Sequence, residues 1–169
     1  FAAGNRGPER LGFSMKPRRL EIEGLRSYRQ KQVVEFEPQG LMAITGATGA
    51  GKSSLLEAMM FALYGVHSGN SKSNKELIGD RSDEMSVTLE FELQGKIYTA
   101  HRAVGRKNQS SFVLAQGDKV LCHDGNRMTA EVTALLGLDE EQFKKTVFLP
   151  QGAFQNFLTS RPKERTELL

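Results

Sequence analysis

Alternating apolar and polar residues open the patterned part of the chain, and this alternation is typical of strands with one buried face. Residues 20–24 alternate in this way, residues 33–36 are rich in β-forming side chains, and residues 41–45 are a short apolar run between Gly40 and Gly46. We predict a strand for each of these three segments.

A continuous apolar segment follows. Residues 52–64, KSSLLEAMMFALY, are apolar on nearly all sides and contain neither Gly nor Pro. Such a segment predicts a buried helix, and Gly65 marks its end. A strand, a glycine-rich turn and a helix are therefore expected to follow one another through residues 41–65.

Beyond residue 65 the sequence is polar up to residue 84, and we expect a surface loop there with one short helical turn around residues 75–78. The apolar period then falls to two, which predicts an antiparallel meander. Two hairpins are expected, residues 87–93 and 96–102 around Gln94-Gly95, and residues 111–115 and 119–122 around residues 116–118.

Two helices are predicted after the meander. Residues 129–136 have a helical pattern that ends at Gly137. Residues 139–143, DEEQF, place carboxylates where a second helix would begin, and negative charge is favourable at the positive end of a helix. The elements together predict an α/β fold.

Composition agrees with one compact domain, because 38% of the 169 residues are hydrophobic and 25% are charged. Cys122 is the only cysteine, so an internal disulfide is excluded and a reducing, cytoplasmic location is favoured. No run approaches the roughly 20 apolar residues of a membrane helix, and the beginning of the chain lacks an apolar signal core. We therefore expect no membrane association.

The distribution of charge leaves open whether the chain binds a polyanion such as DNA. The net charge is +3, but residues 1–31 hold eight Lys and Arg against three Glu. A second basic group, Arg102, Arg106 and Lys107, is expected near a hairpin tip. Both groups fit either a solvated surface or contacts with the phosphates of DNA.

The segment Gly46-Ala47-Thr48-Gly49-Ala50-Gly51-Lys52-Ser53 satisfies the phosphate-loop pattern G-x-x-x-x-G-K-[ST]. It also has the required context, an apolar strand before it and a helix after it. Its glycines let backbone N–H groups converge on a phosphate, and the helix adds its positive end. Lys52 is expected to reach the β- and γ-phosphates of ATP, and the Ser53 hydroxyl to bind Mg²⁺.

A phosphate loop alone does not select a function, since kinases, GTPases, helicases and transporter ATPases all use one. The Asn-Lys-x-Asp element of GTPases and the Arg-rich lid of small kinases are both missing. Residues 147–154, VFLPQGAF, predict an apolar strand that runs into a loop headed by Gln151. That amide could bind Mg²⁺ or the attacking water, or belong to an ordinary loop.

From residue 15 onward the chain resembles the SbcC family, the SMC-like ABC ATPases of the bacterial SbcCD nuclease complex, and their archaeal and eukaryotic counterparts in double-strand-break repair. The resemblance lies in the start MKPRRLEIEGLRSY, the loop AITGATGAGKSSLLEAMMFALYG and the segment FKKTVFLPQGAFQNFLTSRPKERTELL. It implies the N-terminal lobe of an ABC-type ATPase head, with a β-meander, that leads into a coiled coil.

The resemblance also assigns roles to residues. Gln151 is implied to be the Q-loop residue that touches Mg²⁺ and the γ-phosphate, and with Lys52 it is the expected catalytic group. Thr48 stands where much of the wider family has Asn. The expected nucleotide-binding residues are Arg26, Ser27, Gly46, Thr48, Gly49, Ala50, Gly51, Lys52, Ser53 and Ser54.

The ends of the chain suggest a fragment. Residues 1–14 show no period and are expected to be a non-native or disordered leader before Met15. Residues 15–160 are expected to form the N-terminal half of an SbcC-type ATPase (AAA) domain, and residues 161–169 the truncated start of a coiled-coil helix. The Walker B run and the signature Ser-Gly-Gly of the family do not occur in these residues.

Three functions remain open at this point. The first is an ATP-driven DNA-repair head whose closure over ATP controls a partner nuclease. Its expected partners are double-stranded DNA, an SbcD-like metallophosphoesterase and a second copy of the head. Its expected location is the cytoplasm, at the nucleoid. The second is an SMC-like chromosome-organising clamp without a nuclease. The third is a transporter ATPase, which the long spacing from Lys52 to Gln151 disfavours.

Overall fold

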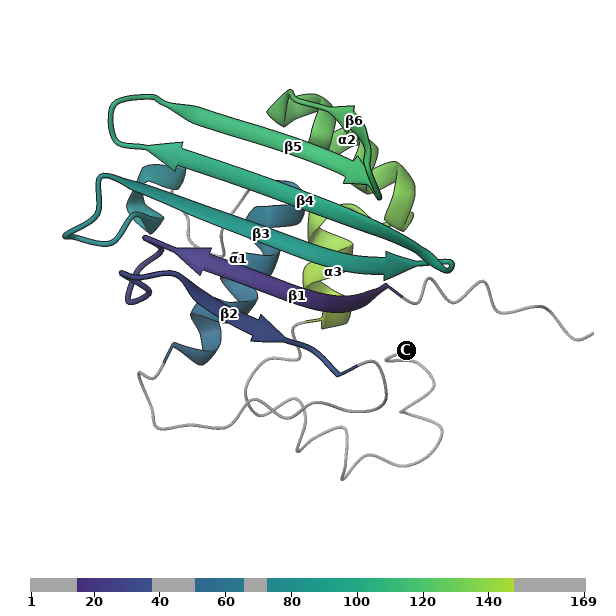
Figure 1. Cartoon of the computed structure of the whole chain (residues 1–169), viewed down its shortest axis with the longest axis horizontal. Helices are drawn as coiled ribbons and strands as arrows, with labels where there is room; N and C mark the ends of the chain where they lie inside the picture. The colour runs from purple at the N-terminus through teal and green to yellow at the C-terminus, as the bar shows by residue number, and fades with distance from the viewer. Residues whose placement is uncertain (1–14, 38–50, 66–72, 148–169) are drawn as a thin grey trace, which may run out of the picture.

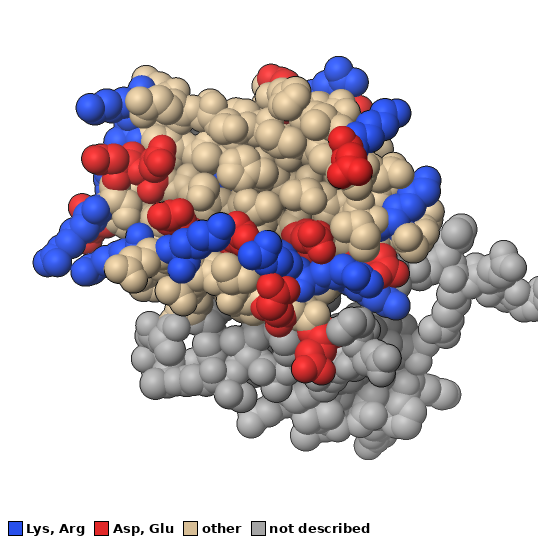
Figure 2. Space-filling view, in the orientation of Figure 1, with Lys and Arg blue, Asp and Glu red and all other residues tan. Residues whose placement is uncertain are grey.

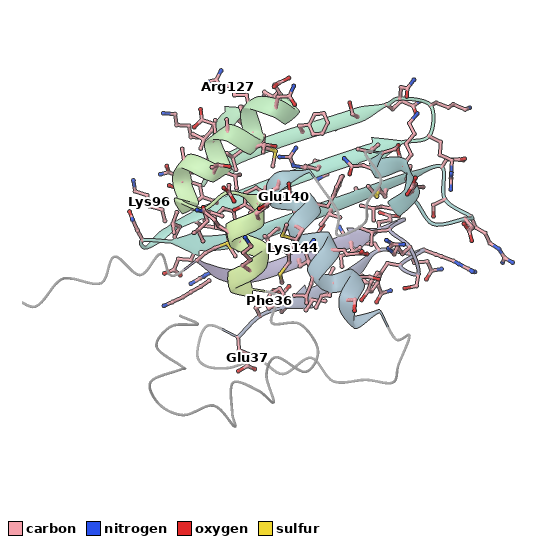
Figure 3. The ribbon with its side chains drawn as sticks, turned by 180° about the vertical axis from the view of Figure 1, so that it is seen from behind. Phe36, Glu37, Lys96, Arg127, Glu140 and Lys144 are labelled. Carbon is pink, nitrogen blue, oxygen red and sulfur yellow. The ribbon has the colours of Figure 1, made fainter. Side chains whose placement is uncertain are left out.

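The structure is a computed structural model of the 169-residue chain, and it describes residues 15–37, 51–65 and 73–147. In these residues the chain folds into one twisted sheet with helices on a single face (Figure 1). Seen from the opposite side, the helices lie in front of the sheet, with Glu140 and Lys144 along the last of them (Figure 3).

The sheet has six strands in the order β2-β1-β3-β4-β5-β6, and every neighbouring pair is antiparallel. The strands are β1 (Lys16–Glu23), β2 (Gln32–Glu35), β3 (Glu84–Leu93), β4 (Lys96–Gly105), β5 (Ser110–Gln116) and β6 (Lys119–Cys122). The helices are α1 (Lys52–Tyr64), η1 (Asn74–Leu77), α2 (Gly125–Leu136) and α3 (Glu140–Val147). The predicted meander is therefore confirmed in β3 to β6.

Alternation along the strands decides which face of the sheet is buried. In β3 every second side chain, from Met85 to Leu93, is buried, and the residues between them are only partly covered. The buried face packs on α1, whose Phe61 and Leu63 are fully inaccessible to solvent. Burying these side chains contributes about 1.5–3 kcal/mol each, and this burial fixes α1 against the centre of the sheet.

The helix α1 has no polar face because it is covered on more than one side. Besides the sheet, α2 and α3 pack against it. The ring centroids of Tyr64 in α1 and Phe143 in α3 lie 5.5 Å apart. The Tyr64 hydroxyl donates to the carbonyl oxygen of Leu138 at 2.9 Å. The prediction of a buried helix over residues 52–64 is confirmed.

Several boundaries differ from the predictions: β1 begins at Lys16 rather than residue 20, β3 begins at Glu84 rather than residue 87, and β4 runs on to Gly105. Helix α2 begins at Gly125, four residues earlier than expected, because the Asp124 carboxylate accepts a hydrogen bond from the N–H of Arg127 at 2.8 Å and caps the helix. Val147 belongs to the end of α3, so the strand predicted for residues 147–154 does not begin there. The other residues of that segment, the predicted strand at residues 41–45 and the predicted final helix lie outside the described residues. No helix within the described residues is long and apolar enough to span a membrane.

Candidate nucleotide-binding site

Gly51, the last glycine of the predicted phosphate loop, immediately precedes α1. Its φ is 87°, in the left-handed region that favours glycine, and no side chain caps the helix that follows. The first N–H groups of a helix have no acceptors within the helix, so the start of α1 offers donors and a positive partial charge. This arrangement suits a phosphate group.

Among the other predicted nucleotide and metal ligands, the structure describes two serines at the start of α1. Ser53 is exposed in the first turn of α1 and Ser54 is half-buried. A hydroxyl is a hard oxygen donor of the kind that Mg²⁺ accepts, so the exposed Ser53 fits the predicted metal ligand. Gly46, Thr48, Gly49, Ala50 and Gln151 lie outside the described residues, and their roles stay predictions.

The turn between β1 and β2 lies against the start of α1. Arg26 donates from Nε and Nη2 to the two carboxylate oxygens of Glu57 in α1, at 2.6 and 3.2 Å. Tyr28 donates from its hydroxyl to the carbonyl oxygen of Gly51 at 3.1 Å. The turn is therefore held against α1 by Arg26 and Tyr28, and the exposed Ser27 lies between them in the sequence. That Arg26 and Ser27 contact a nucleotide stays a prediction.

Tyr28 and Glu57 were not among the predicted site residues. Glu57 carried a signal in the sequence, because a carboxylate inside a helix that is apolar on nearly all sides must find a partner or remain charged at a high cost. The side chain of Glu57 is indeed only 10% exposed and is paired with Arg26. Tyr28 carried no such signal, because an aromatic residue after a strand is equally compatible with the core.

Neither alternative for the basic group, a solvated surface or a contact with DNA phosphates, is correct for Arg102. Arg102 lies inside β4 rather than at the hairpin tip and is 2% exposed. Its guanidinium donates to the carbonyl oxygens of Ala62, Leu63 and Gly125 at 3.0, 3.1 and 3.2 Å. These carbonyl groups take three of the five N–H donors of the guanidinium, and the Thr129 hydroxyl takes a fourth, so Arg102 serves the fold.

Arg106 and Lys107 follow β4 and are both exposed. Arg106 is tied to the neighbouring loop, since it donates from Nε to the carbonyl oxygen of Ser82 at 3.0 Å and from Nη2 to that of Gly79 at 3.1 Å. A DNA contact by these two residues stays a prediction.

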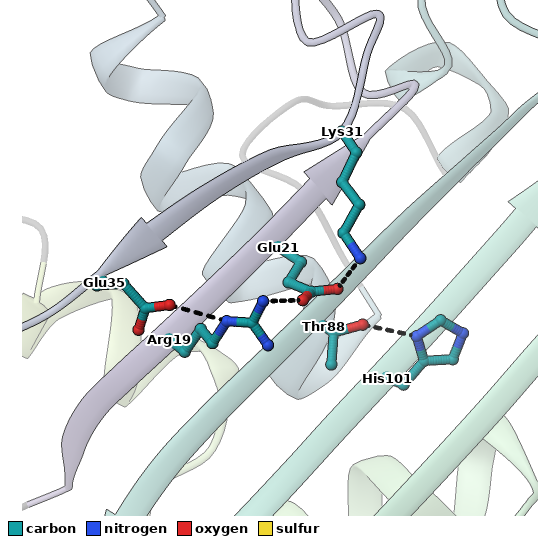
Figure 4. Close-up of polar contacts among 6 residues, drawn as sticks. All are labelled: Arg19, Glu21, Lys31, Glu35, Thr88 and His101. Carbon is teal, nitrogen blue, oxygen red and sulfur yellow. Dashed lines mark hydrogen bonds and ion pairs between the residues drawn. The ribbon is translucent and has the colours of Figure 1, made fainter.

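The basic excess near the N-terminus is largely paired within the described part of the chain. On the outer sheet face, Arg19 contacts both Glu21 and Glu35, and Lys31 contacts Glu21, at 2.6 to 2.9 Å (Figure 4). In Figure 2 this face carries a row of alternating blue and red side chains below a broad uncharged area. The pairing favours the solvated-surface interpretation over attraction to a polyanion.

Comparison with known proteins places this geometry in a family. Residues 19–169 match the AAA domain family. The chain belongs to that family. The match begins at Arg19 within β1 and includes the rest of the described sheet and all the described helices.

The relatives of this AAA domain agree with the resemblance found in the sequence. It is 36% identical to the SbcC component of the nuclease SbcCD of Deinococcus radiodurans, over 92% of this chain and 18% of that protein. It is 34% identical to a probable DNA double-strand break repair Rad50 ATPase of Aquifex aeolicus, over 92% of this chain and 16% of that protein. The predicted resemblance to SbcC is confirmed, and the chain spans less than a fifth of the length of these relatives.

Solved structures support the fold of this AAA domain. An SMC ATPase studied for ATP-driven dimerization and DNA-stimulated activation matches with a TM-score of 0.63 and 22% identity, over 90% of this chain and 96% of that one. The recombination mediator RecF with ATP matches with a TM-score of 0.52 and 22% identity, over 65% of this chain and 28% of that one. The predicted lobe of a P-loop ATPase head is therefore confirmed as the fold.

Proposed function

We propose that this chain is the ATP-binding N-terminal lobe of a head that works in DNA double-strand-break repair together with a partner nuclease. The observation that carries the proposal is the junction at Gly51, where a complete phosphate-loop sequence leads into the buried helix α1. The resemblance to SbcC over nearly the whole chain narrows the general ATP site to this class of head.

Within this proposal different residues bind the phosphates of ATP and the Mg²⁺ ion. The loop from Gly46 to Gly51 and the first N–H groups of α1 hold the phosphates, and Lys52 neutralises the β- and γ-phosphates. Ser53 and Gln151 would hold Mg²⁺, which would offset the negative charge of the phosphates. Arg26 and Ser27 approach from the turn after β1, where Arg26 is already held by Glu57.

Hydrolysis requires a group that orients the attacking water, and we propose that the complete head supplies it. ATP held between two heads then closes them, and closure controls a metallophosphoesterase nuclease that acts on double-stranded DNA. In this scheme Gln151→Ala depresses hydrolysis more than ATP binding, because its amide acts when the γ-phosphate and the metal are both in place.

The test is to co-purify the intact protein with an SbcD-like metallophosphoesterase from the same organism and to measure cleavage of linear double-stranded DNA with and without ATP. The proposal predicts a stable complex whose cleavage depends on ATP and is lost in the Lys52→Ala variant. A protein that binds ATP and retains DNA but associates with no nuclease would instead be the chromosome-organising clamp.

A further inference from the structure

Tyr28 reaches from the turn after β1 to Gly51, the residue that joins the phosphate loop to α1. Its hydroxyl and the N–H of Leu55 both donate to the carbonyl oxygen of Gly51, each at 3.1 Å. Three atoms of the phenol, Oη, Cζ and Cε2, lie 3.0, 3.3 and 3.4 Å from the position that a Cβ on Gly51 would occupy. The ring therefore packs directly on the backbone of Gly51.

This contact fixes the direction of a donor that Tyr28 does not touch. The C=O and N–H groups of a trans peptide point in opposite directions, so a fixed Gly51 carbonyl also fixes the N–H of Lys52. That N–H is at the first position of α1 and has no acceptor within the helix. It is one of the donors that a phosphate at a helix start accepts.

The turn that carries Tyr28 is itself firmly held. Arg26 has a φ of 48°, a left-handed conformation that costs a non-glycine residue about 1–2 kcal/mol. The conformation persists because the N–H of Arg26 donates to the carbonyl oxygen of Leu77 at 2.7 Å and its guanidinium pairs with Glu57. The N–H of Gly79 also donates to the carbonyl oxygen of Gly24 at 2.8 Å. Strain of this kind, held by several contacts, is common where a binding site must be preformed.

We propose that Tyr28 is a positioning residue for nucleotide binding, because its hydroxyl orients the Gly51–Lys52 peptide before the phosphates arrive. The inference rests on the proposed ATP site and adds to it how the chain prepares that site. Orientation of a donor in advance lowers the ordering cost of binding, so its loss weakens affinity although no ligand contact is removed.

The test compares two matched variants of the intact protein, Tyr28→Phe and Tyr64→Phe. Each removes one phenolic hydroxyl that donates to a backbone carbonyl, the first at the start of α1 and the second near its end. Loss of such a hydrogen bond lowers stability similarly in both variants. The proposal predicts that Tyr28→Phe raises the Kd for ATP-Mg²⁺ about threefold to tenfold, whereas Tyr64→Phe changes it by less than about twofold.

Hydrogen exchange without nucleotide gives a second measurement. The N–H of Leu55 shares the Gly51 carbonyl with Tyr28, so its exchange should accelerate in Tyr28→Phe and remain unchanged in Tyr64→Phe. Any of three results would overturn the proposal. Tyr28→Phe could bind ATP as tightly as the wild type, both variants could lose the same ATP affinity, or exchange at Leu55 could be unchanged in Tyr28→Phe. If the wild type bound no ATP, the proposed function would fall, and exchange at Leu55 would still decide whether Tyr28 orders the helix start.

Discussion

The guanidinium of Arg102 in β4 lies at the end of α1, where its Nε donates to the carbonyl oxygen of Ala62 at 3.0 Å. Its Nη2 donates to the carbonyl oxygen of Leu63 at 3.1 Å and to the hydroxyl of Thr129 in α2 at 2.9 Å. Burial lowers the pKa of Arg102 to about 10, which leaves it charged at neutral pH. A cation at the negative end of a helix is favourable, so this one side chain joins the sheet to two helices.

Arg102→Met should therefore destabilise the protein although it retains an apolar stem of similar length. The change leaves several buried carbonyl groups without donors, and we expect the free energy of unfolding to fall by at least about 3 kcal/mol. Denaturant unfolding measures this loss. The exposed neighbour Lys107→Met is the control, with an expected change within about 0.5 kcal/mol. A loss in Arg102→Met as small as that of the control would mean that the carbonyl groups find other partners.

The wrong prediction for Arg102 has a physical reason. Alternate residues of a strand share a face, and Arg102 shares its face with Tyr98 and Ala100, both of which are buried. The alternation therefore predicts a buried side chain at position 102. The positive charge of Arg102 and its closeness in sequence to Arg106 and Lys107 instead favoured an exposed basic group. The acceptors that make its burial favourable come from α1 and α2, which only the tertiary structure brings to β4.

Other features could be predicted because their causes are local. The β3–β4 hairpin turns at Gln94 and Gly95, both with positive φ, as a two-residue turn between twisted strands requires. The start of α2 could also have been found, since Asp124 is a good capping residue. The position of β1 between β2 and β3 could not, because strand order depends on contacts between distant segments.

Gly24 and Gly95 form a matched pair for testing how tightly the turn after β1 is packed. Both have positive φ, 69° and 75°. A Cβ on Gly24 would lie 2.1 Å from the carbonyl oxygen of Glu84, whereas a Cβ on Gly95 would meet nothing within 4 Å. Gly95→Ala should cost about 1 kcal/mol from backbone strain alone, and Gly24→Ala at least about 2 kcal/mol more. Thermal unfolding measures both losses of stability. Equal losses in Gly24→Ala and Gly95→Ala would show that the β3 backbone at Glu84 moves to accommodate the added methyl group at little cost.

His101 on the outer sheet face should make stability depend on pH. Its Nδ1 lies 2.8 Å from the Thr88 hydroxyl (Figure 4), and burial lowers its pKa from the ordinary value of 6.5, partly offset by the carboxylate of Glu21. The unfolded chain therefore binds more protons than the folded protein as the pH falls through 6.5, so stability is present above that pH and is lost below it.

The measurement is urea unfolding at about pH 7.5 and about pH 5.5, on either side of the ordinary histidine pKa. His101→Gln should lose less stability between these two conditions than the wild type does. The exposed His123→Gln serves as the control and should behave like the wild type. An identical pH dependence in His101→Gln and the wild type would contradict this role of His101.

The central claim is that ATP-Mg²⁺ binds at the phosphate loop that ends at Gly51 and continues into α1. The most direct measurement is a titration of the intact protein with ATP-Mg²⁺ by calorimetry, for the wild type, Lys52→Ala and the control Lys119→Ala, which removes an exposed lysine from β6. An ammonium placed opposite the triphosphate is not replaced by water, so Lys52→Ala should bind ATP at least about 100-fold more weakly, while Lys119→Ala should match the wild type. Wild-type affinity in Lys52→Ala would contradict the account.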